Sequence, residues 1–136
     1  MNTITFKKLN DGWNAEPNDP AENVVVYGNL VELSFALNPW EFDAAEGSRA
    51  TLNFSQCARW RLGRPNDEGW YRGQGRFETS SHSWGEFYEV FDATQSVEEP
   101  TDWKILNPEH RKSRHFLFYL RDNTFECYAQ DWTLSR

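Results

Sequence analysis

The sequence predicts a single all-β domain that spans residues 1–136 and is built from antiparallel hairpins. Three observations support this fold class. Apolar and polar residues alternate with a period of two, turn-forming pairs separate the alternating runs, and no long stretch has a helical stripe. About nine short strands at close spacing are typical of a sandwich or a barrel. Both architectures remain alternatives, because both consist of short antiparallel strands.

The first part of the chain contributes three of the expected strands. Residues 3–9 (TITFKKL) form a short strand candidate. Residues 22–37 (ENVVVYGNLVELSFAL) predict two strands that meet at Gly28-Asn29, a pair suited to the positive φ angles of a tight hairpin turn. Turn signals follow this hairpin, with a single candidate for a helical turn at residues 41–45.

Residues 52–62 predict a further strand whose even-numbered side chains form its buried face. Arg59 and Arg61 then lie on the wetter face. We expect a turn and a return strand at residues 71–77, with Trp60 opposite Gly73, because the glycine leaves room for the tryptophan ring.

The last part of the chain predicts two shorter strands, at residues 84–91 and 102–106, and a hairpin at residues 115–129. We expect this hairpin to turn at Asp122-Asn123, with Leu120 opposite Phe125. Its predicted apolar face comprises Phe116, Phe118, Leu120, Phe125, Cys127 and Ala129. Its predicted wetter face comprises His115, Leu117, Tyr119, Arg121, Glu126, Tyr128 and Gln130.

The charge balance limits the classes of function. With 14 basic and 21 acidic residues, the formal net charge of −7 argues against nucleic-acid binding and suits a basic partner. Two cysteines do not make a disulfide framework, no stretch approaches the length of a membrane span, and the first residues lack a signal peptide. We therefore expect a cytoplasmic protein without membrane contact and without a cofactor.

Five arginines lie close together between residues 59 and 76, although the chain is acidic. In the expected register Arg61 lies directly opposite Arg72, and like charges in that position repel. One interpretation is an internal network of ion pairs, with Glu86, Glu89 and Glu126 as the carboxylate partners. A second is a ligand site for an anion, such as a phosphate or an acidic partner segment, or for a sugar, and a third is a simple spread of solvated charges. The candidate residues of the ligand site are Arg59, Arg61, Arg72, Arg76 and Trp70.

No sequence motif indicates catalysis or metal binding. The three histidines and two cysteines lack metal-ligand spacing, and no nucleophile elbow, Walker loop or dinucleotide motif occurs. Paired acidic residues are expected by chance among 21, so no catalytic residue and no enzyme activity is assigned.

Tryptophans near strand ends and loops offer a different kind of site. They are Trp13, Trp40, Trp84, Trp103 and Trp132. Exposed rings can stack on sugars or anchor a protein partner, whereas buried ones would cap the two ends of the core. Two exposed tryptophans in a groove would indicate a carbohydrate, and a flat patch would indicate a protein.

The chain has a general resemblance to a group of known proteins in three segments, HFLFYLRDNTFECYAQDW, NDEGWYRGQGRF and WGEFYEV. With them the chain resembles small uncharacterised bacterial all-β proteins, some of which are immunity proteins that bind and neutralise toxins. The resemblance implies a small, acidic, cytosolic protein that covers a site on its partner. It transfers no functional residue.

The residues and the resemblance together favour a cytosolic binding protein that meets a basic protein partner through acidic and aromatic surface. A toxin-neutralising role belongs to this hypothesis. The alternative is a sandwich or barrel module that binds a small anion or a sugar at its arginine and tryptophan face. An exposed edge strand could pair with a copy of itself, but the sequence does not locate the edges.

Overall fold

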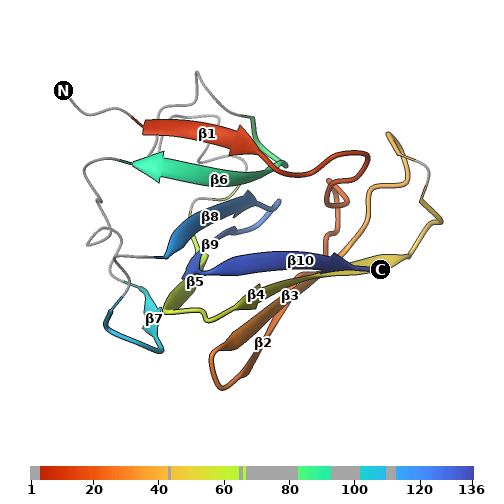
Figure 1. The fold of residues 1–136 in the computed structure, drawn as a ribbon. Helices are drawn as coiled ribbons and strands as arrows, with labels where there is room; N and C mark the ends of the chain where they lie inside the picture. Colours follow the sequence, from red (N-terminus) through yellow and green to blue (C-terminus); the bar gives the residue numbers. More distant parts are fainter. Residues whose placement is uncertain (1–3, 43, 65, 67–82, 93–101, 110–112) are drawn as a thin grey trace.

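The computed structural model describes residues 4–42, 44–64, 66, 83–92, 102–109 and 113–136. These residues form ten strands in two antiparallel sheets and no helix, so the predicted all-β fold is confirmed. The sheets face each other as a sandwich, and in the described chain neither closes into a barrel (Figure 1). None of the described residues forms a helix that is long and apolar enough to cross a membrane.

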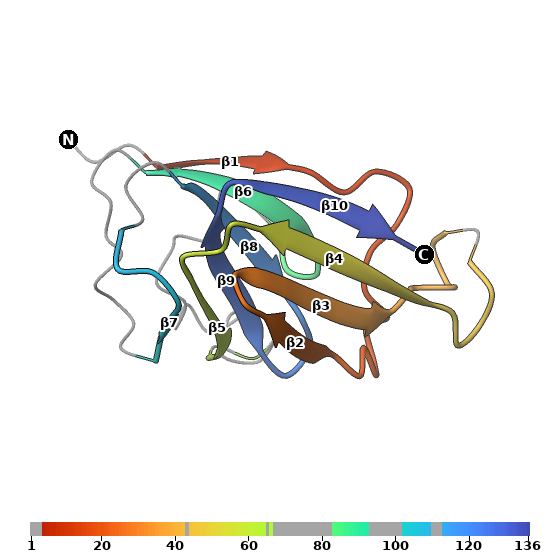
Figure 2. The same cartoon turned by 60° about the horizontal axis from the view of Figure 1, so that its bottom comes forward.

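The larger sheet has six strands and the smaller sheet has four (Figures 1 and 2). The larger has the order β1 (Ile4–Lys8), β6 (Phe87–Asp92), β8 (Arg114–Tyr119), β9 (Thr124–Ala129), β5 (Arg59–Gly63) and β7 (Lys104–Ile105). The smaller has the order β10 (Asp131–Ser135), β4 (Arg49–Ser55), β3 (Leu30–Ala36) and β2 (Asn23–Tyr27).

An aromatic core fills the space between the two sheets. Phe54 of β4 is fully buried, and its ring centroid lies 5.3 Å from that of Phe116 and 5.4 Å from that of Phe125, both on the larger sheet. Trp13, which is 5% exposed, closes one end of the core against Phe35 at 5.8 Å. Since aliphatic content is modest, these rings supply much of the buried apolar area.

The β2–β3 hairpin forms as the sequence predicts. Tyr27 pairs with Leu30, which leaves Gly28-Asn29 as a two-residue turn. Gly28 has a φ of 59°, whereas Asn29 is not among the residues with positive φ. A positive φ at the first turn position alone is the pattern that favours glycine there.

A bent ribbon of two strand pairs connects the sheets. β4 pairs with β10 up to Ser55 and Asp131 in the smaller sheet, and β5 pairs with β9 from Arg59 and Tyr128 in the larger one. Between these pairs, residues 56–58 face residues 129–130, so one strand carries an extra residue. This is a β-bulge, a feature that bends a strand and re-aims the side chains beyond it.

The bulge explains why the expected continuous strand at residues 52–62 is wrong. Gln56 has a φ of 52°, in the left-handed region, which breaks the alternation. Cys57, expected on the wetter face, is 1% exposed and packs in the core. Backbone bonds from Cys57 N to Asn29 O (2.7 Å) and from Ala58 N to Tyr128 O (2.7 Å) hold the bend.

The hairpin at residues 114–129 has the predicted faces but a different register. Phe118, not Leu120, lies opposite Phe125, and Tyr119 lies opposite Thr124. The connection therefore has four residues instead of two, closed by a bond from Leu120 N to Asn123 O at 2.9 Å. A slip by two residues keeps every side chain on its predicted face.

The predicted wetter face of this hairpin is largely buried. Leu117, Tyr119 and Glu126 are 1%, 2% and 3% exposed, and only its outermost members, Arg121 and Gln130, are exposed as predicted. Partly buried rings cover this outer face of the larger sheet, among them Phe6, Trp84 and Trp103. The sheet is therefore packed on both of its faces.

Other expectations have mixed outcomes. The strands expected at residues 3–9, 84–91 and 102–106 occur as β1, β6 and β7, each shorter or shifted, and β10 was not predicted. Where residues 41–45 are described, they form no helical turn. The return strand expected at residues 71–77 lies outside the described residues. Trp60 has Lys104 and Cys127 as its two neighbours in the sheet, so its expected pairing with Gly73 is wrong.

The conformation of Gln56 predicts the effect of substitutions at the bulge. A β-branched side chain is strained at positive φ, whereas asparagine tolerates it. We expect Gln56→Val to lower the free energy of unfolding by about 1–3 kcal/mol. Gln56→Asn serves as the control and should change it by no more than about 0.5 kcal/mol. Urea denaturation measures both, and equal stability of the two variants would contradict the assigned backbone conformation.

Candidate functional site

Two of the five candidate site residues are described, and both are buried. Arg59 and Arg61 lie on β5 with their side chains on the outer face of the larger sheet, where they are 8% and 3% exposed. The sequence places them on the correct face of the sheet but expects that face to be wet. Arg72, Arg76 and Trp70 lie outside the described residues.

Arg61 is the centre of a buried network of ion pairs. Its Nε and Nη2 donate to the two carboxylate oxygens of Asp102 at 2.6 and 3.1 Å. Its Nη1 lies 3.7 Å from Oε1 of Glu126, whose side chain is 3% exposed. A carboxylate on each side compensates the guanidinium charge, in the bidentate geometry for which arginine is suited.

The network continues on the far side of Glu126. Its Oε2 lies 2.9 Å from Nε2 of His115, and the His115 ring stacks on Tyr128 with centroids 4.4 Å apart. Hydrogen bonding from Arg61 lowers the pKa of Asp102, which is half exposed. A depressed pKa in the folded state stabilises the fold above the unfolded pKa, and this contribution is lost as the pH falls through the folded pKa.

Gly63 leaves the space that this ion pair needs. A Cβ atom at Gly63 would lie 2.5 Å from Oδ2 of Asp102 and 3.0 Å from Nη2 of Arg61. The ion pair between Arg61 and Asp102 therefore explains both the arginine at position 61 and the glycine at position 63.

The expected carboxylate partners are partly correct. Glu126 does pair with Arg61, but Glu86 pairs with Lys8 and Glu89 pairs with Arg114. Asp102, the closest partner of Arg61, was not foreseen, because β7 could not be placed beside β5 from sequence. Arg61 is thus part of an internal ion-pair network, the first of the three interpretations.

Arg59 differs from Arg61 in its surroundings. Its Nη2 donates to the carbonyl of Pro108 at 3.4 Å, and its buried Nε has no hydrogen-bond partner among the described residues. No ion pair joins Arg59 to any residue of the described chain.

A separate pocket lies at the end of the sandwich where four connecting segments meet. Its volume is about 520 Å³, and residues 14–18, 38, 40–41, 84–86 and 119–121 contribute to its lining. Trp40, 72% exposed, and the half-buried Trp84 both line it. Loops positioned by a rigid sandwich are the usual place for binding residues.

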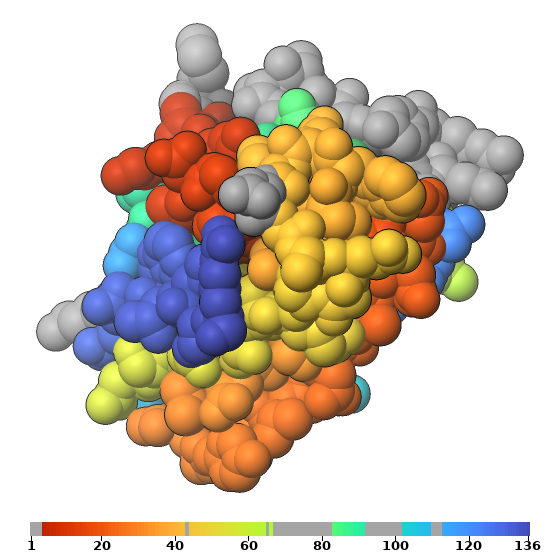
Figure 3. All heavy atoms as spheres, turned by 90° about the vertical axis from the view of Figure 1, so that its right-hand side faces the viewer, coloured from red at the N-terminus to blue at the C-terminus, as the bar shows by residue number. Residues whose placement is uncertain are grey.

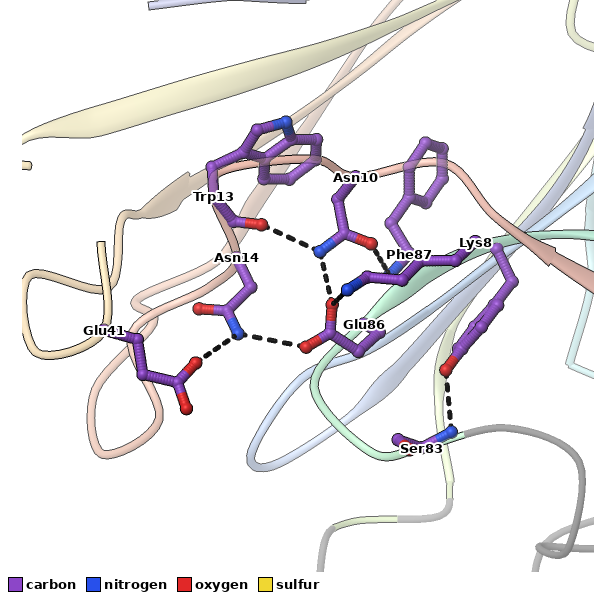
Figure 4. Close-up of polar contacts among 9 residues, drawn as sticks. Lys8, Asn10, Trp13, Asn14, Glu41, Ser83, Glu86 and Phe87 are labelled. Carbon is purple, nitrogen blue, oxygen red and sulfur yellow. Dashed lines mark hydrogen bonds and ion pairs between the residues drawn. The ribbon is translucent and has the colours of Figure 1, made fainter. Parts of the chain in front are cut away.

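Asn14, Glu41 and Glu86 form one hydrogen-bonded group in the polar lining of this pocket (Figure 4). Asn14, 7% exposed, donates from one nitrogen to Glu86 at 3.2 Å and to Glu41 at 3.4 Å. The other oxygen of Glu86 accepts from Asn10 and lies 3.4 Å from Nζ of Lys8. The amide of Asn14 therefore holds two carboxylates close together at the pocket wall.

The pocket is acidic and rich in acceptors. Of the described residues, three carboxylates, Glu16, Glu41 and Glu86, and one cation, Arg121, line it, and Arg121 donates to the carbonyl of Asn18 at 2.8 Å. Glu86 is already surrounded by donors, whereas the exposed Glu41 has one. A ligand with positive charge and several N–H donors matches this lining best.

Sequence reasoning found only part of this pocket. It identified Trp40 and Trp84 as candidates for a groove but assigned Glu86 to the arginines and did not consider Asn14 or Glu41. The sequence signal for this pocket lies in two loops, NAEPNDP and NPWEF. Both combine asparagine, proline and acidic residues, and the second also contains aromatic residues, a composition typical of binding loops. What brings these loops to Trp84 is the sheet topology.

The other three candidates, Trp13, Trp103 and Trp132, serve the core or the outer face of the larger sheet. Trp13 and Trp132 pack against Phe87, with centroids 6.3 and 5.1 Å away. Trp103 packs on Tyr128 at 5.5 Å, and within the described part of the chain its buried indole N–H has no hydrogen-bond partner.

Neither metal binding nor thiol chemistry is supported in the described part of the chain. It contains no group of three or more His, Cys, Asp or Glu residues that could hold a metal ion. Cys57 and Cys127 are free and buried. Burial raises the pKa of the Cys127 thiol well above its usual value, so this thiol stays protonated and is a poor nucleophile.

The arginine network and the pocket are thus two distinct features, one internal and one open to solvent. Comparison with models of protein families, with curated proteins and with solved structures found no match to this chain. The chemistry of the pocket is therefore the main argument for a function.

The buried network predicts a strong effect of Arg61→Gln. Removing the guanidinium leaves Glu126 as a buried charge, and we expect a loss of about 3–5 kcal/mol in the free energy of unfolding. Arg64→Gln is the matched control, because the Arg64 side chain is exposed. Adding Glu126→Gln to Arg61→Gln should recover part of the loss. Equal denaturation midpoints for wild type and Arg61→Gln would show that the network does not stabilise the fold.

The burial of both thiols predicts their reactivity. In the native protein, neither Cys57 nor Cys127 should react with Ellman's reagent on the time scale of a free thiol, and both should react in urea. Fast labelling of the native protein would contradict the packing of these residues in the core.

Proposed function

We propose that this protein is a binding protein that receives a basic side chain of a protein partner in the pocket at Trp40, Glu41 and Glu86. The observation that carries the proposal is an open cavity of about 520 Å³ whose lining combines three carboxylates with an exposed tryptophan. An arginine or lysine side chain is long enough to enter such a cavity and carries donors for Glu41, whose carboxylate accepts a single hydrogen bond from the described residues.

Cation–π attraction supports a basic ligand. An arginine or lysine placed over a tryptophan face gains about 0.5–2 kcal/mol, depending on how much water the contact excludes. Trp40 is the most exposed large hydrophobic residue in the described chain, and the carboxylate that follows it, Glu41, is also exposed. Aromatic anchors of this kind often dominate the binding energy of a protein interface.

Long-range electrostatics favours the same class of partner. The formal net charge of −7 would attract a basic protein and increase its association rate at low salt. We propose the cytoplasm as the site of action, and a basic toxin is one partner of the required chemistry, in keeping with a toxin-neutralising role.

A sugar is the second candidate ligand, because two tryptophans line the same pocket with three asparagine side chains nearby. The asparagines are Asn14, Asn18 and Asn38. Aromatic stacking combined with amide hydrogen bonds suits a neutral carbohydrate. The acidic lining favours the basic ligand over this alternative, and the experiment below distinguishes them.

We predict that blocked arginine binds in the pocket and that its neutral isostere does not. The probes are Nα-acetyl-arginine-methylamide, the citrulline analogue and methyl glucoside, each followed by ¹H–¹⁵N correlation spectra of the labelled protein. The arginine probe should shift the indole signals of Trp40 and Trp84, and the citrulline probe should not. Trp40→Ala should weaken arginine binding about two- to thirtyfold, and Glu41→Gln, which removes an exposed carboxylate, up to about fivefold.

Glu46→Gln is the matched control, since Glu46 is exposed in the same loop and lies outside the pocket lining. Equal shifts with arginine and citrulline would contradict a charge-based site. Shifts of both indoles with methyl glucoside alone would replace the basic ligand with a carbohydrate.

A further inference from the structure

The outer edge of β2 is the least protected sheet edge in the described chain. β2 (Asn23–Tyr27, NVVVY) ends the smaller sheet and carries no charged residue. Figure 3 shows its hairpin, in orange, at one end of the molecule. Exposed, uncharged, β-branched edges of this kind are templates for further strand pairing.

The other three edges of the two sheets are protected. β1 carries the exposed Lys7 and Lys8, and β7 has two residues. β10 begins at Asp131, which pairs with Arg114, and the charged Arg136 follows it. Lysine, charge and short length are the usual protections of an edge strand. β2 has no charged residue within its five residues, and the carboxylate of Glu22, which directly precedes it, accepts a hydrogen bond from Asn123.

The geometry of β2 favours a second copy of the same strand. We propose that β2 pairs with β2 of another molecule, antiparallel and centred on Val25, so that the smaller sheets of two copies form one continuous sheet. This placement sets Val24 of one copy opposite Val26 of the other and Tyr27 opposite Asn23. Each position meets an uncharged residue, so the strand is complementary to itself.

The inner faces of the two smaller sheets also match across the two-fold axis at Val25. Val24 and Val26 pair with Leu33 and Val31, which are buried in the core, so both valines lie on the inner face. Val26 is nevertheless 38% exposed, because among the described strands none lies beyond β2. Self-pairing brings the valines of the two copies together on one face, where cross-strand apolar pairs stabilise a sheet.

The short length of β2 limits the strength of the dimer. Five residues on each side compare with roughly 20–30 on each side of a stable interface, so the dimer is weak and forms at high protein concentration. Each copy also carries a formal net charge of −7. Because salt screens repulsion beyond roughly 8 Å at physiological ionic strength, dimerisation should increase with salt.

Analytical ultracentrifugation of the wild type over a concentration series, at low and high salt, tests the proposal. We expect a reversible monomer–dimer equilibrium that shifts towards the dimer at high salt. In Val25→Lys the dimer should be lost, because two lysines would face each other on the axis. Thr133→Lys, which adds the same charge to exposed β10, should leave it unchanged. A wild type that stays monomeric throughout, or a dimer that persists in Val25→Lys, would overturn the proposal.

Cross-linking provides an independent readout that does not depend on the lysine variant. Residues directly opposite on neighbouring strands have Cβ atoms about 4.5–5.5 Å apart, close enough for a disulfide after a small adjustment. Under mild oxidation, Val25→Cys should give covalent dimers, and Thr133→Cys should not. Equal cross-linking of the two variants would place the contact elsewhere and contradict the β2 pairing.

Discussion

Gln56 adopts left-handed backbone geometry at the point where a two-stranded ribbon passes from the smaller sheet into the larger one. The ribbon consists of β4–β5 on one side and β9–β10 on the other, and one extra residue at its bend sets which side chains face the core beyond it. Ser55 receives a backbone bond from Gln130 N at 3.0 Å, so both strands turn together. The relative position of the two sheets depends on this corner.

Two consequences follow for the charged residues. Beyond the bend, Trp60 and Leu62 pack against the core, and Arg61 points to the opposite face of the larger sheet. There it meets Glu126 and Asp102. If the ribbon continued without its extra residue, the pairing of β5 with β9 would slip by one position, and Arg61 would lie beside Phe125 instead of Glu126. The ion-pair network therefore exists only in the bulged register.

The sequence predicted the features that depend on local chemistry. The all-β class, the Gly28-Asn29 turn and the faces of the last hairpin follow from alternation and turn preferences. It failed where the outcome depends on distant segments. The residues around Gln56 do not indicate its positive φ. The residues around His115 and Glu126 do not indicate that other parts of the chain cover their side of the sheet. The local pattern then suggested a wet surface, which is the usual environment of such residues.

The same distinction applies to the candidate site. Arg59 and Arg61 were recognisable as an unusual cluster, but their role depends on Asp102, which is 41 residues away from Arg61. The pocket depends on contacts over still longer separations, since Asn14 and Glu86 are 72 residues apart. The tryptophans could be identified from sequence because they are rare and large. Their carboxylate neighbours could not, because acidic residues are common in this chain.

Cross-strand nuclear Overhauser effects at the corner test the central claim most directly. The bulged register predicts that Ser55 is opposite Asp131 and that Arg59 is opposite Tyr128, both in the same sample. A ribbon without the extra residue would keep the first contact and place Arg59 opposite Cys127. Observation of the Ser55–Asp131 and Arg59–Tyr128 contacts would support the corner, whereas an Arg59–Cys127 contact would contradict it.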